Sequence, residues 1–252
     1  MIPYFGLPIT PETAAARAIT SAHAFVCWKY PEQLDLVLTV CQTFAVDNSA
    51  FSAWMSGKPV TDWSEYYAWV QELHRYPSFD FAVIPDVIDG DEAANDALIE
   101  EWPWRKTAPW VGAPVWHMHE SLDRLLRLAM EFPRICIGSS GEYAVIGSPR
   151  WWLRMAEAMN RICDKEGRPI CKIHGLRMLD PDVFTKFPFA SADSTNIGRN
   201  IGIDSKWRGS YQPKTKECRA LVMRDRTEAY QPVVLWDRKA APIQTDFLLE
   251  TA

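Results

Sequence analysis

The sequence predicts an α/β protein built as a (β/α)8 barrel of the TIM type, and three observations lead to this prediction. Short apolar runs alternate with longer amphipathic stretches, an alternation that is typical of βα repeats around a parallel sheet. Eight such runs occur, and eight strands close a TIM-type barrel. The chain has 252 residues, and a barrel of this type typically needs about 250.

The expected strands are rich in Val, Ile and Phe and are bounded by Pro, Gly or polar residues. They cover residues 2–6, 24–29, 43–48, 79–86, 114–119, 134–139, 170–175 and 189–194. A doubly wound open sheet is the alternative arrangement of βα units. No G-x-G-x-x-G motif follows any of these runs, so nothing favours a dinucleotide-binding version of that alternative.

Helices are expected between the strands. Residues 62–76 begin with Asp and Ser and carry apolar residues at helical spacing, and 121–132 and 148–167 are similar. Gly167 is expected to be the carboxyl-terminal cap of the last helix, and shorter helices are expected within 89–102 and 179–187. Residues 205–252 show little periodicity, so we expect a barrel over 1–204 and an extension or cap over 205–252.

The composition is that of an ordinary globular protein, with 48% hydrophobic and 23% charged residues. The net charge of −5 is uneven, because residues 206–226 hold seven basic and two acidic side chains, a local charge of +5 that leaves −10 on the remainder. A basic segment on an acidic body can bind a polyanion, and it can equally be a solvated tail.

The sequence predicts a cytoplasmic protein without a membrane segment. No apolar run reaches the roughly 18 to 20 residues of a membrane span, and the start of the chain does not resemble a signal peptide. Six cysteines are scattered without a C-x-x-C pair, which indicates reduced, buried thiols rather than a zinc site built from cysteines.

Polar residues stand at the carboxyl end of one expected strand after another. The set is Asp47, Asn48, Asp86, His117, His119, Gly138, Ser139, Ser140, His174 and Asp193. Each alone suits a turn, a helix cap or a hydrogen-bonded wall residue. Together they repeat one position, and in a barrel these strand ends converge on the mouth where active sites are built.

Two acids in this set follow similar apolar runs, Asp47 in "FAVDNSAF" and Asp193 in "FASADST". A carboxylate aimed at an electrophilic carbon can act as a nucleophile, and a second can serve as general acid and base. Such a pair suits substitution at the anomeric carbon of a sugar, where one acid attacks and the other protonates the leaving group.

At these residues the chain resembles a known family. "VDNSAFSAW" is similar to a motif of tRNA-guanine transglycosylases, and more similar to the related 7-deazaguanine DNA-modification transglycosylases of phages and bacteria. "KIHGLRM" followed by "FASADSTNIGRN" resembles the late-barrel motifs of that DNA-modifying branch, and "FAVIPDVI", "PVWHMHES" and "ICIGSSGEY" fall in the expected order between them. The resemblance covers residues 2–204.

The resemblance implies a base exchange on nucleic acid that needs no cofactor and no metal. Asp193 would attack C1′ of a guanosine and expel guanine, and Asp47 would protonate the leaving purine and later deprotonate the incoming 7-deazaguanine, such as 7-cyano-7-deazaguanine. Asp86 would bind the Watson–Crick edge of the purine, and His117 or His119 stands where the family has a base-contacting Gln. The other residues implied around the base are Asn48, Ser49, Phe51, Gly138, Ser139, Ser140, His174 and Asn196.

Two departures from the family bear on the substrate. Ser49-Ala50 replaces the usual Gly-Gly after the first acid, and the Cys/His zinc motif of the tRNA enzymes is absent. The second departure favours DNA over tRNA as the partner. Phosphate contacts are then expected from basic residues near the mouth and in the basic stretch, namely Lys172, Arg177, Arg199, Lys206 and Arg208.

Two alternatives stay open at the level of the sequence. A metal-dependent barrel hydrolase could use His117 and His119 on one strand together with His174 and Asp193. A nucleic-acid-binding barrel without catalysis is the other. The oligomeric state is also open, with a homodimer as one candidate.

Overall fold

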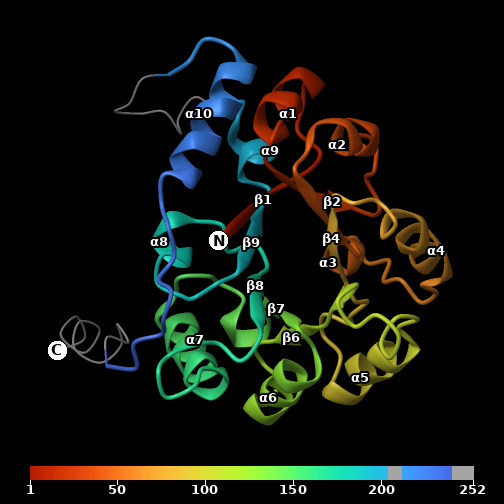
Figure 1. Cartoon of the computed structure of the whole chain (residues 1–252), viewed down its shortest axis with the longest axis vertical. Coiled ribbons are helices and arrows are strands. Elements are labelled where there is room, and N and C mark those ends of the chain that lie inside the picture. The colour runs from red at the N-terminus through yellow and green to blue at the C-terminus, as the bar shows by residue number, and fades with distance from the viewer. Residues whose placement is uncertain (204–211, 240–252) are drawn as a thin grey trace.

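The computed structural model describes residues 1–203 and 212–239, and it confirms the predicted barrel. Figure 1 shows the strands in a central ring with helices around them. In the described residues the strands form one parallel sheet of nine, in the order β5-β4-β3-β2-β1-β9-β8-β7-β6. The strands are β1 (Ile2–Gly6), β2 (His23–Cys27), β3 (Thr43–Asp47), β4 (Phe79–Val83), β5 (Gly112–Ala113), β6 (Val115–His117), β7 (Arg134–Gly138), β8 (Lys172–Gly175) and β9 (Ser191–Ser194).

The ring nearly closes at Pro114, which separates β5 from β6. Gly112–Ala113 pairs with β4, and Val115–His117 pairs with β7. Proline has no N–H to donate to a ladder, but its carbonyl still accepts from the Cys136 N–H at 2.8 Å. The expected fifth strand, 114–119, contains β6 alone, and β5 lies just before that range. The two short strands lie at the two ends of the sheet, one on each side of Pro114.

Helices fill the gaps as expected, with several that the sequence pattern did not single out. The helices expected from the pattern are α4 (Ser64–Leu73), α5 (Glu92–Glu101), α6 (Leu122–Glu131), α7 (Pro149–Ile162) and α8 (Pro181–Phe184). The additional ones are α1 (Glu12–Ile19), α2 (Leu34–Val40), α3 (Ala50–Met55), the 3-10 turn η1 (Gly141–Tyr143), α9 (Asn196–Asn200) and α10 (Lys216–Glu228). The side chains of Asp91, Ser121 and Ser148 cap α5, α6 and α7 by accepting a backbone N–H of the first turn.

Gly167 is not the cap of α7, so that expectation is wrong. The helix ends at Ile162, and Gly167 lies in the following turn with a φ of +84°. The Trp236 backbone N–H donates to the Gly167 carbonyl at 2.8 Å. A Cβ there would lie 3.0 Å from the Trp236 nitrogen, so the glycine allows a close approach of two backbones.

The core has two layers. Inside the barrel, side chains of alternate strand positions fill the axis, including Tyr4, Phe25, Phe81, Val115 and Cys136. A larger layer lies between the strands and the surrounding helices. The inner layer fills the middle of the barrel, and the open space lies above it, at the carboxyl ends of the strands.

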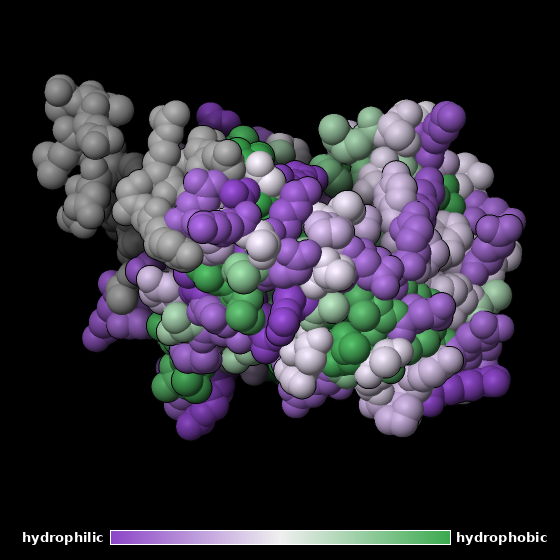
Figure 2. Space-filling model, turned by 90° about the horizontal axis from the view of Figure 1, so that it is seen from above, coloured by the Kyte–Doolittle hydropathy of each residue, from purple (hydrophilic) through white to green (hydrophobic). Residues whose placement is uncertain are grey.

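The region after residue 204 contributes α10, which packs beside α1 (Figure 1). Thr13 Oγ1 donates to Glu217 at 2.5 Å, and Arg224 Nη1 donates to the Thr20 carbonyl at 2.8 Å. Ala220 of α10 is fully buried in the outer core layer. Figure 2, which views the molecule from above Figure 1, shows a largely hydrophilic surface with separate apolar patches.

The cysteines are free thiols, as expected, but not all are buried. Cys136 and Cys163 are buried, whereas Cys218 on α10 is exposed. In the described part of the chain, no helix has the length and apolar character needed to cross a bilayer.

Candidate active site

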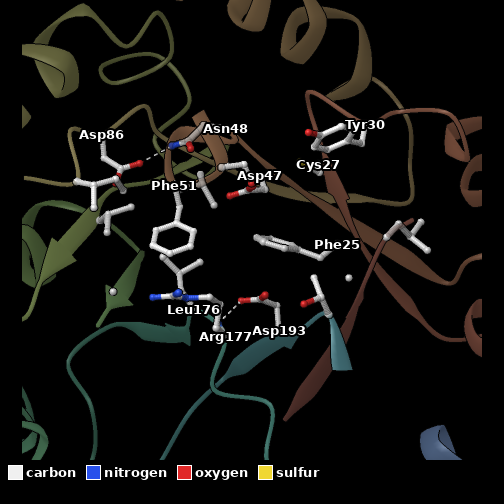
Figure 3. A pocket seen from close by; sticks show the side chains of 18 of the residues that line it. Phe25, Cys27, Tyr30, Asp47, Asn48, Phe51, Asp86, Leu176, Arg177 and Asp193 are labelled. Carbon is white, nitrogen blue, oxygen red and sulfur yellow. Dashed lines mark hydrogen bonds between the residues drawn. The ribbon is translucent and has the colours of Figure 1, made fainter. Parts of the chain in front are cut away.

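A cavity of about 270 Å³ opens at the carboxyl ends of the strands. Residues from almost every strand end reach it, as the position of active sites in such barrels leads one to expect. Figure 3 shows Asp47 and Asp193 pointing into this space from different strands. The polar lining residues are Cys27, Tyr30, Asp47, Asn48, Ser52, Asp86, His117, Ser139, Arg177, Asp193, Thr195 and Arg199.

Asp193 is held by one of its two carboxylate oxygens. It lies on β9 in register with Tyr4 of β1, and 4% of its surface is exposed. The Arg177 backbone N–H donates to Oδ1 at 2.8 Å, and His174 Nε2 lies 3.3 Å from the same oxygen. Among the described residues Oδ2 has no hydrogen-bond partner, so one oxygen is fixed and the other is available to a ligand.

Asp47, the last residue of β3, lies in the same cavity and has an altered acidity. Its Oδ2 accepts the Ser49 N–H at 3.1 Å. Burial raises the pKa of the Asp47 carboxyl to about 7, and the negative charges of Asp193 and Asp86 add to the effect. A carboxyl group with a pKa near 7 can both give and take a proton at neutral pH.

A fixed row of polar groups forms one wall of the cavity. Asn48 Nδ2 donates to Asp86 Oδ1 at 2.7 Å and to the Ile84 carbonyl at 2.9 Å, while its Oδ1 accepts from the Ala50 N–H. His117 Nε2 lies 3.0 Å from Asp86 Oδ2. Both ring nitrogens of His117 are buried without a hydrogen bond in the described residues, so Nε2 is close to Asp86 without bonding to it. The row therefore offers carboxylate and imidazole groups to a ligand with its own donors and acceptors.

Ser49 supports Asp47 from behind rather than facing the cavity. Its φ of +65° is in the left-handed region that favours glycine. The Ser49 hydroxyl accepts the Lys29 N–H at 3.1 Å and lies 3.0 Å from Cys27 Sγ. These contacts hold a backbone whose N–H binds Asp47.

Arg177 and Phe51 form one side of the cavity. The Arg177 guanidinium lies 4.1 Å from the centroid of the Phe51 ring, and its Nη2 donates to the Ser139 carbonyl at 3.2 Å. Burial lowers the pKa of Arg177, and the nearby charge of Arg199 acts in the same direction. Figure 3 shows Phe51, Phe25 and Leu176 around the space between the two acids, so flat apolar surface is available to a planar ligand.

Several expected ligand-contacting residues lie outside the lining. His119 is exposed and stacks on His117 at 5.7 Å, and its Nδ1 lies 2.8 Å from Ser140 Oγ. Of the two histidines, only His117 lines the cavity. His174 is fully buried beneath Asp193. Asn196 lines a second cavity of about 290 Å³.

The second cavity adjoins the first and is mainly polar. The two share Arg177, Thr195 and Arg199 as lining residues. No hydrogen bond or ion pair of Arg199 to another side chain occurs within residues 1–203 and 212–239, and Arg177 lies close enough to feel its charge. Two cations therefore stand at the wall between the cavities.

The expected basic contacts divide into three groups. Arg177 and Arg199 lie at the mouth. Lys172 does not, so its expected position near the mouth is wrong: it is the first residue of β8, paired with Arg134 at the amino ends of the strands. Lys206 and Arg208 fall outside the described residues.

The structure adds lining residues that the sequence pattern did not mark. Cys27 is the last residue of β2, Tyr30 lies in the turn after it, and Thr195 follows the end of β9 at Ser194. The same rule of polar residues after strand ends applies to all three, but β2 ends at Cys27, two residues before the expected end. Gly6 and Leu7 also line the cavity, and no pattern in the sequence marks them.

The proposed metal ligands do not form a site. In the part of the chain that the structure describes, no three His, Cys, Asp or Glu side chains are grouped to hold a metal ion. His119 turns away from the cavity, and His174 lies between Ser191 and Asp193 with both ring nitrogens near protein oxygens. The geometry of the donors thus disagrees with the metal-dependent alternative.

Comparisons with known proteins leave the family of the chain unassigned. No protein-family model matches the chain, and no curated protein matches it.

Proposed function

We propose that the protein exchanges guanine in DNA for a 7-deazaguanine base through a covalent bond between Asp193 and C1′ of the target nucleotide. One observation carries the proposal. Asp47 and Asp193 line one cavity at the mouth of the barrel, and the pKa of Asp47 is raised to about 7. A fixed carboxylate beside a carboxyl that gives and takes protons is the pair that substitution at an anomeric carbon requires.

In the first half of the reaction, Oδ2 of Asp193 attacks C1′ as the bond from C1′ to guanine breaks. The electrons of that bond leave with the purine, which takes a proton from Asp47 and departs neutral. Asp47 is then ionised, and the sugar is held to Asp193 as an ester.

In the second half, Asp47 removes the ring N–H proton of the incoming 7-deazaguanine. That nitrogen attacks C1′, the bond from C1′ to Oδ2 breaks, and Asp193 leaves as a carboxylate. Both acids return to their starting states. The proton balance closes without an oxidant, reductant or further reactant.

The wall formed by Asn48, Asp86 and His117 suits recognition of the base. Guanine and its 7-deaza analogues have N–H groups on the Watson–Crick edge, and a carboxylate can accept hydrogen bonds from them. Asp86 is kept in position by Asn48 Nδ2 at 2.7 Å, and His117 lines the cavity beside it. Phe51 offers a ring for stacking, as flipped bases commonly find in their pockets.

DNA is the polymer that the family resemblance favours, with tRNA less favoured. The second cavity, with Arg177 and Arg199 at its border, suits the sugar and phosphate next to the target nucleotide. Flipping a base out of a duplex costs a few kcal/mol, which contacts in the pocket would offset. The basic side chains of α10 contribute less than their number indicates, because Arg219 and Arg224 bind backbone carbonyls within the protein.

Incorporation of labelled 7-cyano-7-deazaguanine into polymer tests the proposal. We expect label in DNA, less in tRNA, and none with Asp193→Ala. Asp89→Asn, an exposed acid in the loop after β4, is the matched control and should retain incorporation. Full incorporation by Asp193→Ala would refute the nucleophile. If the wild type binds DNA but incorporates no label, and Asp193→Ala and Asp47→Ala bind DNA equally well, the non-catalytic alternative would be favoured.

A further inference from the structure

His174 has a position that the reaction above does not use. It lies on β8 in register with Ser191 of β9, one layer below the cavity. Ser191 and Asp193 are two residues apart on the same strand, so both side chains point to the same face of the sheet. The His174 ring lies between them, with Nδ1 2.8 Å from Ser191 Oγ. Nε2 lies 3.3 Å from Asp193 Oδ1, and in the described residues this buried nitrogen makes no hydrogen bond.

Aromatic side chains hold the His174 ring in place. Its centroid is 5.4 Å from that of Phe25, 5.1 Å from that of Phe81 and 6.0 Å from that of Tyr4. The residue has 0% exposure, so solvent does not reach the imidazole. The ring can neither turn freely nor exchange its protein partners for water.

The surroundings define which nitrogen carries the proton. Burial lowers the pKa of His174, against the opposing effect of Asp193, so the imidazole is neutral at neutral pH. Arg134 and Asp80 are the other charged groups that act on it. A neutral imidazole has one N–H, and a carboxylate oxygen can only accept. Nε2 therefore carries the proton toward Asp193, and Nδ1 accepts from the Ser191 hydroxyl.

We infer that His174 is a positioning residue whose Nε2–H closes onto Oδ1 of Asp193 during the reaction, because catalytic hydrogen bonds are often long in the free enzyme and tighten with substrate bound. Together with the Arg177 backbone N–H it holds Oδ1 and leaves Oδ2 as the attacking oxygen. The inference rests on the proposed function. Oδ1 becomes the carbonyl oxygen of the ester when Oδ2 bonds to C1′. When the C1′–Oδ2 bond breaks again, negative charge returns to the carboxylate, and both donors stabilise it.

The two halves of the reaction should therefore respond differently to loss of the His174 donor. A carboxylate that loses a hydrogen-bond donor has a higher pKa and is a poorer leaving group. Breakdown of the adduct should then slow by about 10- to 100-fold, the range for a hydrogen bond to a charged group. Formation of the adduct should slow less, so the adduct should accumulate during turnover.

His174→Phe and His174→Gln test the inference with DNA and labelled 7-cyano-7-deazaguanine as probes. Phe keeps a ring without a donor, whereas the Gln amide can place an N–H near the former Nε2. We expect His174→Phe to lower kcat, leave KM for the free base nearly unchanged and raise the fraction of protein trapped as DNA adduct. In a plot of kcat against pH, the fall in rate on the acid side should occur at a higher pH for His174→Phe than for the wild type. His174→Gln should restore much of the rate, and His74→Phe, at the end of α4, is the control.

Equal slowing of both halves, with the fall in rate on the acid side at the same pH as in the wild type, would overturn the inference and indicate a merely structural role. A second measurement needs no activity. Long-range ¹⁵N–¹H NMR of the free protein, with the His174 signals assigned by their loss in His174→Gln, should show the Nε2–H tautomer at neutral pH. An Nδ1–H or doubly protonated ring would overturn the inference even if base exchange occurs. An Nε2–H ring in a protein without base exchange would instead locate the failure in the proposed function.

Discussion

Asp47→Asn should change how the stability of the fold depends on pH. The pKa of Asp47 rises from 3.8 to about 7 on folding, first because of burial and then because of the charges of Asp193 and Asp86. Because the pKa of Asp47 is higher in the folded than in the unfolded state, its contribution to the stability of the fold is most favourable at low pH. That contribution is lost as the pH rises between these two pKa values. At about 1.4 kcal/mol per pKa unit, the ionised Asp47 costs the fold about 4 kcal/mol above pH 7.

The neutral amide removes this cost while its oxygen can still accept the Ser49 N–H. We therefore expect Asp47→Asn and wild type to have similar free energies of unfolding near pH 4, and the variant to be more stable by up to about 4 kcal/mol at pH 8. Urea unfolding at a series of pH values measures the difference, with Asp89→Asn as the control. A difference between variant and wild type that stays constant from pH 4 to pH 8 would refute the raised pKa.

Three further predictions follow from the geometry. Asp86→Asn removes a charge that raises the pKa of Asp47, so the pH above which adduct formation declines should move lower. If that pH is the same in the variant and the wild type, the charge of Asp86 does not act on Asp47. Arg199→Ala should weaken DNA binding and reduce its salt dependence by about one phosphate contact, measured by salt titration, while affinity for the free base stays the same. Gly112→Ala should destabilise the fold by about 1–3 kcal/mol in urea, because its Cβ would overlap the Trp102 indole ring; Gly202→Ala, with its nearest atom at 3.9 Å, is the control and should show little change.

The barrel could be predicted because its signals are local. Each strand is an apolar run with a polar boundary, and such runs show directly in the sequence. The expected strand 2–6 agrees with the structure, and the expected strand 134–139 differs from β7 by one residue at its end. Helix α10 was less visible in the sequence. Helix α10 buries Ala220 but few large apolar side chains, so its pattern lacks a clear stripe. The end of α7 was also missed, because Gly167 is required by the approach of Trp236 from far along the chain.

The site could be predicted to the level of which strand ends meet, but not to the level of which side chains face the cavity. Asp47, Asp86, His117 and Asp193 were all marked by position after a strand, and all line one cavity. His174 was marked by the same rule, yet it lies one layer deeper. His174 is paired with Ser191, two residues before Asp193 on β9, and apolar runs do not show the register between strands that sets this depth. The hydrogen bond from the Arg177 backbone to Asp193 depends on a φ of +61°, which no local pattern indicates.

Trapping of a covalent protein–DNA species is the most direct test of the pairing of Asp47 with Asp193. Wild-type protein and guanine-containing DNA, quenched by denaturant during turnover, should give a slowly migrating band that releases its DNA when 7-deazaguanine is added before the quench. Mass spectrometry of the digested band should locate the sugar on Asp193, and Asp47→Asn should form the band more slowly. A band that persists in Asp193→Ala, or a modified peptide that lacks Asp193, would contradict the mechanism.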